Sequence, residues 1–469
     1  MQIDLEQIHE ASLKILRKTG VLLDHPEIVE MVKKHGIQVS EQVAYFTGPQ
    51  IMEWIQKAPG SFTLFGRNPE YDVCIGGDTT VFAAGYGATF IVDESGAKRN
   101  ARLEDYLKFL KLVHQSDYFS INGGLLVQPS DISIAGPFPL LLYQSMLHSD
   151  KCLMGGSDGA RETQQSMDLL NICFGDRLHL IQKPRMVSII NSSSPLRFNR
   201  DSLDKLRIHA HYGQPVLITA AVMGGTTGPV TLAGTIAQAN AETLVGIAVS
   251  QMIREGTPAV YGTQSTLADM QTGAYVSASP EHALCIRDGA RLARFYGLPC
   301  RGGGSKSDVH FVSTLSGFDS MLTMLTTCME KMNIVVLSAG MLDSAMAMSY
   351  EKFLLDLQII ALAKRFAQGV HIDVETLALD AIHEVGPGGE FLTNDHTLKF
   401  CRSERWPAPI DSNAAGLMNN HRDMIQWLQE KKAEMLGAYR QPGLPKDVRS
   451  DMEKYPVAAG FDATLPTLV

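Results

Sequence analysis

The stretch of chain that decides the fold runs from Val216 to Gly262 and reads VLITAAVMGGTTGPVTLAGTIAQANAETLVGIAVSQMIREGTPAVYG. It begins with a short apolar run over residues 216–219, continues into a helical pattern over 235–253, and ends in a second apolar run over 259–262. Two short apolar runs joined by a helix-length segment are typical of parallel strands with a crossover helix. The stretch therefore predicts one strand–helix–strand unit of a parallel sheet.

The same alternation continues on both sides of this unit. It predicts strands near 81–91, 118–122, 152–155, 186–190, 216–219, 259–262, 298–301 and 334–337. A helical pattern follows each strand, near 103–114, 140–148, 161–173, 201–211, 235–253, 281–296, 317–331 and 350–367. Eight strand–helix units in succession favour an α/β fold of the (β/α)8 TIM barrel type. The alternative is an open doubly wound sheet, but no G-x-G-x-x-G motif follows an early strand to support it.

Two additions are expected around a barrel core of residues 71–385. Residues 1–70 are predicted to form an N-terminal helical extension, with helices over 4–18 and 26–35 and with Asp24 as the cap of the second helix. Residues 386–469 are predicted to form a C-terminal segment that packs on the barrel and ends in a proline-containing tail. We expect the whole to assemble as a homo-oligomer.

The composition excludes several classes of partner. The formal net charge of −9 disfavours nucleic acid and anionic membranes, since both are bound through basic surfaces. No apolar run approaches the roughly 20 residues of a membrane span, and the acidic start of the chain is unlike a secretory signal. The 7 cysteines lie far apart, which is typical of reduced core residues. We expect a cytoplasmic protein.

Glycine-rich loops follow several of the predicted strands, at the end of a barrel where active sites lie. Gly124, Gly156, Gly225 and Gly303 belong to loops with paired or tripled glycines. Because glycine leaves room for close approach to the backbone, we predict that a flat macrocycle approaches these four positions. For any single loop the alternative is an ordinary tight turn between strand and helix.

The sequence lacks the motifs of the common catalytic and metal sites. His209, His211 and His282 have no further ligand at a recognisable spacing, so no metal site is predicted. There is no G-x-S-x-G elbow and no P-loop. Asp308 and His310 would face opposite ways on a strand. With no catalytic base or nucleophile assigned, we expect a substrate that is already activated.

Three long segments carry a resemblance to a known family. They are Gly224-Gly-Thr-Thr-Gly-Pro-Val-Thr-Leu-Ala-Gly with Ala241-Glu-Thr-Leu, then Ser279-Pro-Glu-His through Tyr296-Gly-Leu-Pro, and Gly386-Pro-Gly-Gly-Glu-Phe-Leu-Thr-Asn-Asp-His-Thr. A weaker match runs from Gly340-Met-Leu-Asp-Ser into Tyr350-Glu-Lys. On these segments the chain resembles the trimethylamine methyltransferase family, in the branch without pyrrolysine.

The resemblance implies a barrel enzyme that moves a methyl group from a small quaternary amine to the Co(I) of a small corrinoid protein. The amine would be of the glycine betaine, proline betaine, carnitine or γ-butyrobetaine type. The enzyme would hold no tight cofactor of its own, because the cobalamin is carried by the partner. A quaternary ammonium leaves as a neutral amine, so the protein has only to desolvate and align the reactants.

Such a substrate requires an aromatic cage and a cation. Aromatic faces hold a trimethylammonium group by cation–π attraction, and Tyr86, Phe90, Phe311 and Tyr350 are the candidates. Arg301, at the end of the seventh strand, is the candidate for a bidentate grip on a carboxylate. Further substrate-binding candidates are Asn191 and His310.

One departure from the family pattern leaves the donor open. Where relatives show an Asp-x-Gln-x-Gly-x-x-Glu type of pattern, this chain reads Ser313-Thr-Leu-Ser-Gly-Phe-Asp319. Two alternative functions are also kept, namely another barrel enzyme such as a lyase and a non-catalytic betaine-binding protein.

Overall fold

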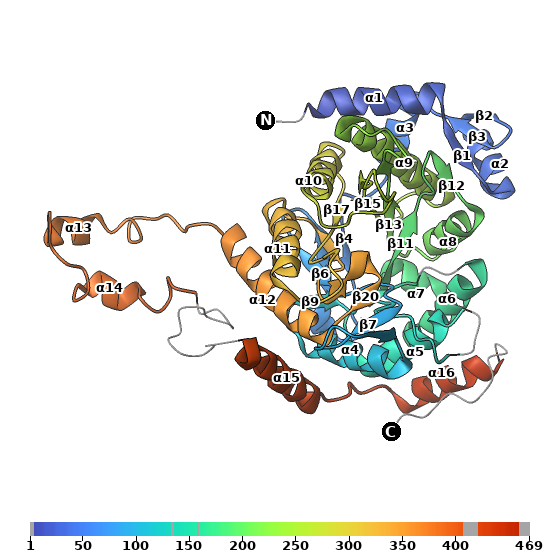
Figure 1. Cartoon of the computed structure of the whole chain (residues 1–469). Coiled ribbons are helices and arrows are strands. Elements are labelled where there is room, and N and C mark those ends of the chain that lie inside the picture. The colour runs from blue at the N-terminus through green and yellow to red at the C-terminus, as the bar shows by residue number, and fades with distance from the viewer. Residues whose placement is uncertain (1–3, 133–135, 157–158, 407–420, 459–469) are drawn as a thin grey trace.

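The computed structural model describes residues 4–132, 136–156, 159–406 and 421–458, and its centre is a ring of short parallel strands surrounded by helices (Figure 1). The ring strands are β6 (Val81–Ala83), β9 (Phe119–Ile121), β10 (Leu153–Met154), β11 (Met186–Asn191), β13 (Val216–Ala220), β15 (Ala259–Thr263), β17 (Cys300–Gly303) and β18 (Ile334–Val336). The helices that follow them are α4 (Leu103–Gln115), α5 (Phe138–His148), α6 (Ala160–Phe174), α8 (Arg200–His211), α9 (Leu232–Ile253), α10 (Pro280–Phe295), α11 (Thr314–Met329) and α12 (Tyr350–Ala367).

The ring closes on itself. Hydrogen-bonded neighbours run in the order β10-β11-β13-β15-β17-β18-β6-β9, and every pairing between neighbours in this order is parallel. A bridge between Ile121 and Cys152 joins the two ends, where the Asn122 amide donates to the Cys152 carbonyl over 2.9 Å. The predicted (β/α)8 barrel is therefore confirmed.

The first predicted strand was too long. Residues 81–91 divide into β6 and β7 (Phe90–Val92), and β7 turns back to pair with β8 (Lys98–Asn100). Gly87 lies between β6 and β7 with φ of +82°, a conformation that interrupts a strand and favours glycine. The β7–β8 hairpin joins a small sheet with β19 (Met341–Leu342) and β20 (Ala347–Met348).

The N-terminal region contains strands as well as the predicted helices. Its helices are α1 (Leu5–Lys18), α2 (Pro26–Lys34) and α3 (Gly48–Ile55), and its strands are β1 (Val21–Leu23), β2 (Gln38–Ser40), β3 (Val43–Tyr45), β4 (Ser61–Leu64) and β5 (Val73–Gly76). Asp24 does not cap α2, because its carboxylate accepts from Arg197 at 2.6 Å. His25 is the cap instead. Arg197 belongs to β12 (Arg197–Phe198), which pairs with β1 and so ties the extension to the barrel.

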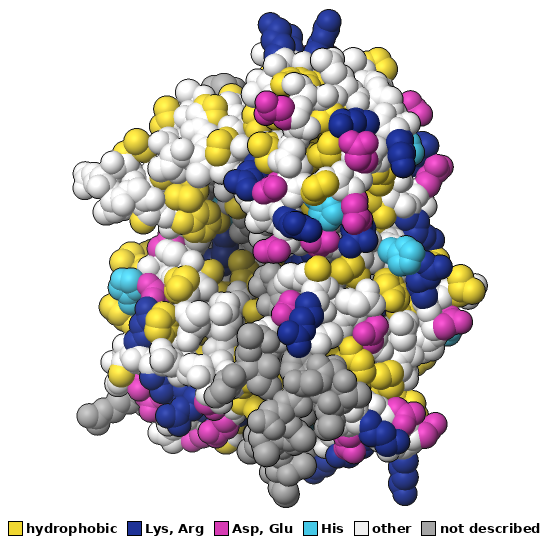
Figure 2. All heavy atoms as spheres, turned by 90° about the vertical axis from the view of Figure 1, so that its right-hand side faces the viewer, with side chains coloured by type: hydrophobic (Ala, Val, Ile, Leu, Met, Phe, Trp, Pro, Cys, Tyr) yellow, Lys and Arg dark blue, Asp and Glu magenta, His cyan; other side chains and the backbone are white. Residues whose placement is uncertain are grey.

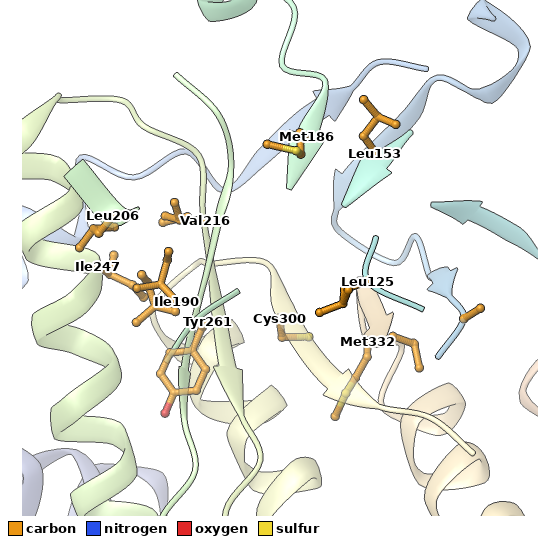
Figure 3. Packing of buried hydrophobic residues seen from close by; sticks show 14 of the residues in the cluster. Leu125, Leu153, Met186, Ile190, Leu206, Val216, Ile247, Tyr261, Cys300 and Met332 are labelled. Carbon is orange, nitrogen blue, oxygen red and sulfur yellow. The ribbon is translucent and has the colours of Figure 1, made fainter. Parts of the chain in front are cut away.

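Alternate strand residues form two apolar layers. Inside the ring, Val187, Leu217 and Val260 cluster with Leu64 and Ile75 of the β4–β5 hairpin, which therefore packs against the lumen. Outside the ring, strand side chains such as Ile190, Val216 and Tyr261 pack in the larger core that includes Leu206 of α8 and Ile247 of α9 (Figure 3). Both layers are apolar because the strands are covered on both faces, so neither face of the sheet is exposed to water.

The C-terminal segment divides into packed and extended parts. The helix α15 (His421–Ala438) contacts α4 and α12, and α16 (Lys446–Ala458) contacts α6. Between α12 and α15, α13 (Leu379–Val385) and α14 (Asp395–Phe400) lie on an arm that extends away from the barrel (Figure 1). Large apolar side chains are exposed along the arm, at Val370, Ile372, Val374, Leu377, Leu379, Ile382, Phe391, Leu392 and Leu398. Of the tail predicted over the last thirty residues, positions 440–458 are described and include α16, whereas 459–469 lie outside the described residues.

The surface carries mixed charge. On the face shown in Figure 2, acidic and basic side chains alternate with apolar ones and form no large patch of one sign. Among the helices that the structure describes, none is both long enough and apolar enough to cross a membrane.

The remaining short elements are α7 (Arg177–Gln182), β14 (Met223–Gly224), β16 (Thr266–Leu267), and the 3-10 turns Pro69–Tyr71 and Asp343–Ala345.

A buried ion pair within α12 links this helix to α11 and to the loop after β18. Lys352 of α12 donates to both carboxylate oxygens of Asp356 at 2.6 Å and to the Ser320 hydroxyl of α11 at 2.7 Å. The amide of Gly340, in the loop after β18, donates to the same carboxylate at 2.8 Å. The motif pieces Gly340-Met-Leu and Tyr350-Glu-Lys thus contribute to one connected network.

Replacing Asp356 with alanine is expected to lower the free energy of unfolding by about 3–5 kcal/mol, since it leaves Lys352 charged and buried without its partner. Equilibrium unfolding in urea measures the change. The matched control is Glu30→Ala, which removes an exposed partner of Lys33 and should cost less than about 1 kcal/mol. Similar small losses in both variants would show that the Lys352–Asp356 pair does not hold these elements together.

Candidate functional site

The alternation along each strand decides which side chains enter the barrel lumen. Leu217 of β13 and Val260 of β15 belong to the lumen cluster. Two residues further along, Thr219 lies beside Gly262, and Gly262 lies beside Arg301 of β17. These three positions therefore face the lumen at the carboxyl ends of the strands, the end that carries the active site in barrel enzymes. We call this end the mouth of the barrel.

Arg301 is a buried cation without an acidic partner. The residue is 4% exposed, and its Nε and Nη1 atoms have no hydrogen-bond partner among the described residues. Burial lowers the pKa of Arg301 to about 10, while the phenol groups of Tyr275 and Tyr86 act in the opposite direction. The guanidinium is still charged near neutral pH, so it is desolvated and ready to pair with an anion.

A second polar cluster lies beside Gly303, at the end of the same strand. Lys306 donates to the Gln264 side-chain oxygen at 2.9 Å and lies 2.8 Å from Nε2 of His282. His282 Nδ1 lies 3.0 Å from the Ser265 carbonyl oxygen and donates a hydrogen bond to it. The proton of the neutral ring is therefore on Nδ1, and Nε2 accepts a hydrogen bond from Lys306. Lys306 and Gln264 also lie 3.3 and 3.1 Å from the position that a Cβ at residue 303 would occupy. Glycine at 303 therefore makes room for this cluster.

Burial governs the protonation of this cluster. Burial, together with the charge of the nearby Arg301 and against the opposing charge of Asp308, lowers the pKa of Lys306 to about 7. Burial, with Lys306 adding to the effect, holds the pKa of His282 well below its ordinary value. His282 is consequently a neutral acceptor, and Lys306 changes its charge near neutral pH.

Two tyrosines accompany Arg301. Tyr86 lies in the loop between β6 and β7 and donates to the Gly155 carbonyl over 3.1 Å. Tyr275, in the loop before α10, donates to the Gln264 carbonyl over 2.9 Å, and its ring centre is 6.0 Å from the Lys306 ammonium. Tyr275 was not singled out by the sequence, because it follows an irregular turn rather than a strand.

The other predicted aromatic residues and His310 lie elsewhere. Phe90 on β7 is covered by the ammonium of Lys98, 4.0 Å from the ring centre. Tyr350 stacks on Phe109 of α4 with ring centres 4.3 Å apart, so it packs within the helix layer. Phe311 is 53% exposed and lines a surface pocket of about 430 Å³ with residues 93–96. His310 is 77% exposed and pairs with Asp343.

Asp308 and His310 do not form an acid–base pair. Asp308 accepts hydrogen bonds from Ser277 at 2.7 Å, from the Ala278 amide at 3.2 Å and from the Ser344 hydroxyl at 2.7 Å. These bonds hold together the loops before α10, after β17 and before β20. Asp308 is therefore a loop-organising residue with its oxygens already occupied.

Asn191 lies at the mouth, at the end of β11. Its register partner is Thr219, which places it on the lumen side, and it is exposed. The loop that follows is organised by the fully buried Glu242 of α9, which accepts from Ser192 at 2.5 Å, from Ser194 at 2.7 Å and from the Leu196 amide at 2.8 Å. The family motif Ala241-Glu-Thr-Leu thus fixes the loop beside Asn191.

Three of the four predicted approach glycines are packed against protein atoms. A Cβ at Gly124 would lie 2.5 Å from the Met154 carbonyl oxygen, and one at Gly156 would lie 2.4 Å from the Phe138 ring. A Cβ at Gly225 would lie 2.6 Å from the Met270 sulfur. The fourth, Gly303, faces the polar cluster. Tight packing is therefore enough to require glycine at the first three positions.

Histidines that the sequence offered as metal ligands are dispersed. His209 is fully buried on α8, where burial lowers its pKa to about 3, whereas His211 contacts the Arg177 guanidinium near the surface. His282 belongs to the Lys306 cluster. Within the part of the chain that the structure describes, no three His, Cys, Asp or Glu side chains gather in a way that could hold a metal ion.

Comparison with solved structures supports the barrel assignment. The crystal structure of the Methanosarcina barkeri monomethylamine methyltransferase aligns with a TM-score of 0.52 at 10% sequence identity, covering 94% of this chain and 88% of that chain. A complex of the same type of enzyme with hydroxylamine aligns with a TM-score of 0.53. At this identity the likeness concerns the fold alone.

Sequence comparison identifies the family. The chain is 37% identical to the glycine betaine methyltransferase of Desulfitobacterium hafniense (strain Y51) over 458 residues, covering 96% of this chain and 95% of the relative. It is 29% identical to the proline betaine:corrinoid methyltransferase of Eubacterium limosum, with 96% of each chain covered. The model of the trimethylamine methyltransferase family matches residues 2–458. The chain therefore belongs to the trimethylamine methyltransferase (MTTB) family.

Proposed function

We propose that this protein is a methyltransferase that moves a methyl group from a small betaine to the Co(I) of a separate corrinoid protein. Two relatives that match nearly the whole chain are named for betaines, and one of them for transfer to a corrinoid. The observation within the molecule that carries the proposal is Arg301, which is buried in the barrel with two donor atoms that have no hydrogen-bond partner among the described residues. A betaine carboxylate supplies the matching anion.

The substrate-binding residues that we propose come from two strand ends and two loops at the mouth. Arg301 holds the carboxylate, and the rings of Tyr86 and Tyr275 face the trimethylammonium group. Asn191, at the end of β11, helps to orient the substrate. Because Phe90, His310, Phe311 and Tyr350 are occupied in the contacts described above or lie on the surface, we propose supporting roles for them.

The protein's own contribution to the reaction is binding, orientation and exclusion of water. A quaternary amine already carries a good leaving group, so no general base is required. The corrinoid supplies the nucleophile and arrives on a small partner protein, and we propose that it approaches the mouth near Gly303. Holding the methyl group in line with the nucleophile supplies several kcal/mol of the catalytic effect, to order of magnitude.

Two further proposals concern the protein's setting. We propose that it acts as a homo-oligomer, since large apolar side chains are exposed along the arm over residues 370–398 and exposed apolar surface often marks an interface. We also propose that it works in the cytoplasm, which fits the free state of all its cysteines.

The function is tested by mixing the purified protein with a reduced corrinoid protein and a panel of betaines, and by following the cobalt absorbance. We expect Co(I) to become methyl-Co(III) only when both the protein and a betaine are present, with one methyl group transferred per betaine. Faster transfer from tertiary amines than from every quaternary amine would contradict the assignment. Conversion of a betaine without methylation of cobalt would favour a lyase, and binding without any conversion would favour a binding protein.

The role of Arg301 is tested with Arg301→Ala and Arg301→Lys. Truncating one partner of a desolvated charge pair costs about 2–5 kcal/mol, so kcat/KM for glycine betaine should fall at least about 30-fold in Arg301→Ala. The lysine variant keeps the charge but loses the planar fork, and its loss should be smaller. Tetramethylammonium has no carboxylate, so its slower reaction should be little changed.

The control for these variants is Arg291→Ala, which removes an arginine that pairs with Glu330 on the helix layer. It should leave kcat/KM for both donors near the wild-type value. Equal losses for glycine betaine and tetramethylammonium in Arg301→Ala would assign Arg301 to the fold or to docking of the corrinoid protein.

Tyr275 provides the complementary test of the ammonium end. Tyr275→Leu removes the ring, and loss of one cation–π contact of about 0.5–2 kcal/mol should weaken binding of glycine betaine and tetramethylammonium by similar factors of roughly 2 to 30. Tyr275→Phe keeps the ring and should retain most of the affinity. A loss confined to glycine betaine would place Tyr275 at the carboxylate instead.

A further inference from the structure

The donors around Arg301 belong to a larger set than one guanidinium. Arg301 Nε, Arg301 Nη1 and the Gln264 Nε2 are buried, and none of the three has a partner within the described residues. Lys306 is 1% exposed and touches the same Gln264 side chain. Buried donors are normally satisfied, so several unsatisfied ones beside two cationic side chains indicate a site for an acceptor that comes from outside the protein.

The contacts of Lys306 leave one position open on its nitrogen. Gln264 Oε1 and His282 Nε2 both accept from Lys306, because the other ring nitrogen of His282 donates to Ser265. These two bonds use two N–H groups, which a neutral amine and an ammonium both possess. The third position is therefore a lone pair in the neutral form and a third donor in the charged form.

Within the described residues, no carboxylate forms a hydrogen bond with Lys306 or Arg301, and Asp308 acts on Lys306 only at a distance. The titratable and charged groups that face Lys306 are Arg301 from β17, His282 from α10, Tyr275 from the preceding loop and Asp308 from its own loop. Asp308 interacts with Lys306 only through its charge, because its oxygens accept from Ser277, Ala278 and Ser344. On α11, Asp319 accepts from the Ser307 hydroxyl at 2.7 Å.

We propose that Lys306 and Gln264 join Arg301 in a single site for the substrate carboxylate, and that Lys306 takes up a proton from solvent when the carboxylate binds. This inference rests on the proposed betaine substrate. The bound form contains an ammonium at Lys306, a guanidinium at Arg301 and the carboxylate, whereas the free form contains a neutral amine and a guanidinium. One proton enters per carboxylate, and no bond other than the new N–H is made.

The protonation state of Lys306 in the free enzyme supports proton uptake on binding. Burial and Arg301 lower the pKa of Lys306 to about 7, so the free amine is mostly neutral at pH 8. An adjacent carboxylate favours the ammonium and raises that pKa again. Above pH 7, binding therefore requires a proton, and the affinity for a betaine should fall by up to about tenfold per pH unit until the pKa of the complex is reached.

The experiment is calorimetric titration of the full-length wild-type protein with glycine betaine at pH 8, without corrinoid protein. It is run in phosphate and in Tris, whose protonation enthalpies differ. The difference between the two observed enthalpies gives the number of protons exchanged. We expect uptake approaching one proton per glycine betaine at pH 8 and markedly less at pH 6, and none for tetramethylammonium at either pH.

Two variants assign the proton to a residue. Lys306→Met should abolish the uptake and weaken glycine betaine binding more than tetramethylammonium binding. The matched control is Lys151→Met. Lys151 is also a buried lysine, but it donates to the carbonyls of Val113 and Ser116 at the start of β10, away from the mouth. This control should keep the wild-type proton uptake.

The outcomes separate this inference from the proposed function. Equal enthalpies in the two buffers, uptake that persists in Lys306→Met, or equal uptake with tetramethylammonium would each overturn the role of Lys306. Methyl transfer to Co(I) in the absorbance assay would stand in all three cases. Proton uptake by wild-type protein that transfers no methyl group would overturn the methyltransferase proposal and leave the carboxylate site, and a failure of every betaine in the panel to bind would overturn both.

Discussion

The constraint on which the rest of this structure depends is the closure of eight short strands into one ring. Several of the strands contain only two or three residues, and a single bridge between Ile121 and Cys152 joins the ends. Closure fixes the register of each pair, and the register fixes which side chains enter the lumen. Arg301 faces inward because it pairs with Gly262 and Ile334, and both of those positions belong to the lumen side.

A cation in such a place is costly unless something compensates it. The lumen below Arg301 is filled by apolar side chains, and the β4–β5 hairpin packs against them from the other end. Arg301 is 4% exposed, and within the described residues its Nε and Nη1 atoms have no hydrogen-bond partner. A cost of this kind is carried by functional sites, where a ligand supplies the missing charge, and it explains why Lys306 beside it is held near the point of losing its own charge.

The fold was largely predictable from the sequence, and its departures have local causes. All eight strands and their helices follow from short apolar runs alternating with helical patterns. The pattern did not show that residues 81–91 break at Gly87, nor that β1 pairs with β12, because both depend on contacts between distant segments. Asp24 was a reasonable cap by residue type, but its carboxylate instead accepts a hydrogen bond from Arg197, which approaches it only in the folded chain.

The site was less predictable for a related reason. The rule that chemistry follows the strand ends led to Arg301, Tyr86 and Asn191. It could not find Lys306, Gln264 or Tyr275, because their chemistry arises from contacts between loops that lie up to 42 positions apart. Tyr350 was a candidate because of its aromatic side chain, but in the structure this side chain stacks on Phe109 in the helix layer. Glycine runs suggested an open surface, whereas three of those glycines are required by packing.

The lack of an assigned catalytic base or nucleophile and the presence of several buried hydrogen-bond donors around Arg301 both fit the proposed reaction. When the substrate brings its own leaving group, selection among methylated amines becomes the main task of the protein, and a carboxylate is the feature that separates betaines from other quaternary amines. A site with several buried donors discriminates strongly against a ligand that lacks the acceptor, since those donors are then left unpaired. In the proposed binding mode, the carboxylate would lie deep in the barrel and the methyl groups nearest the mouth, where we propose that the corrinoid arrives. Recognition and alignment would then be achieved by the same contacts.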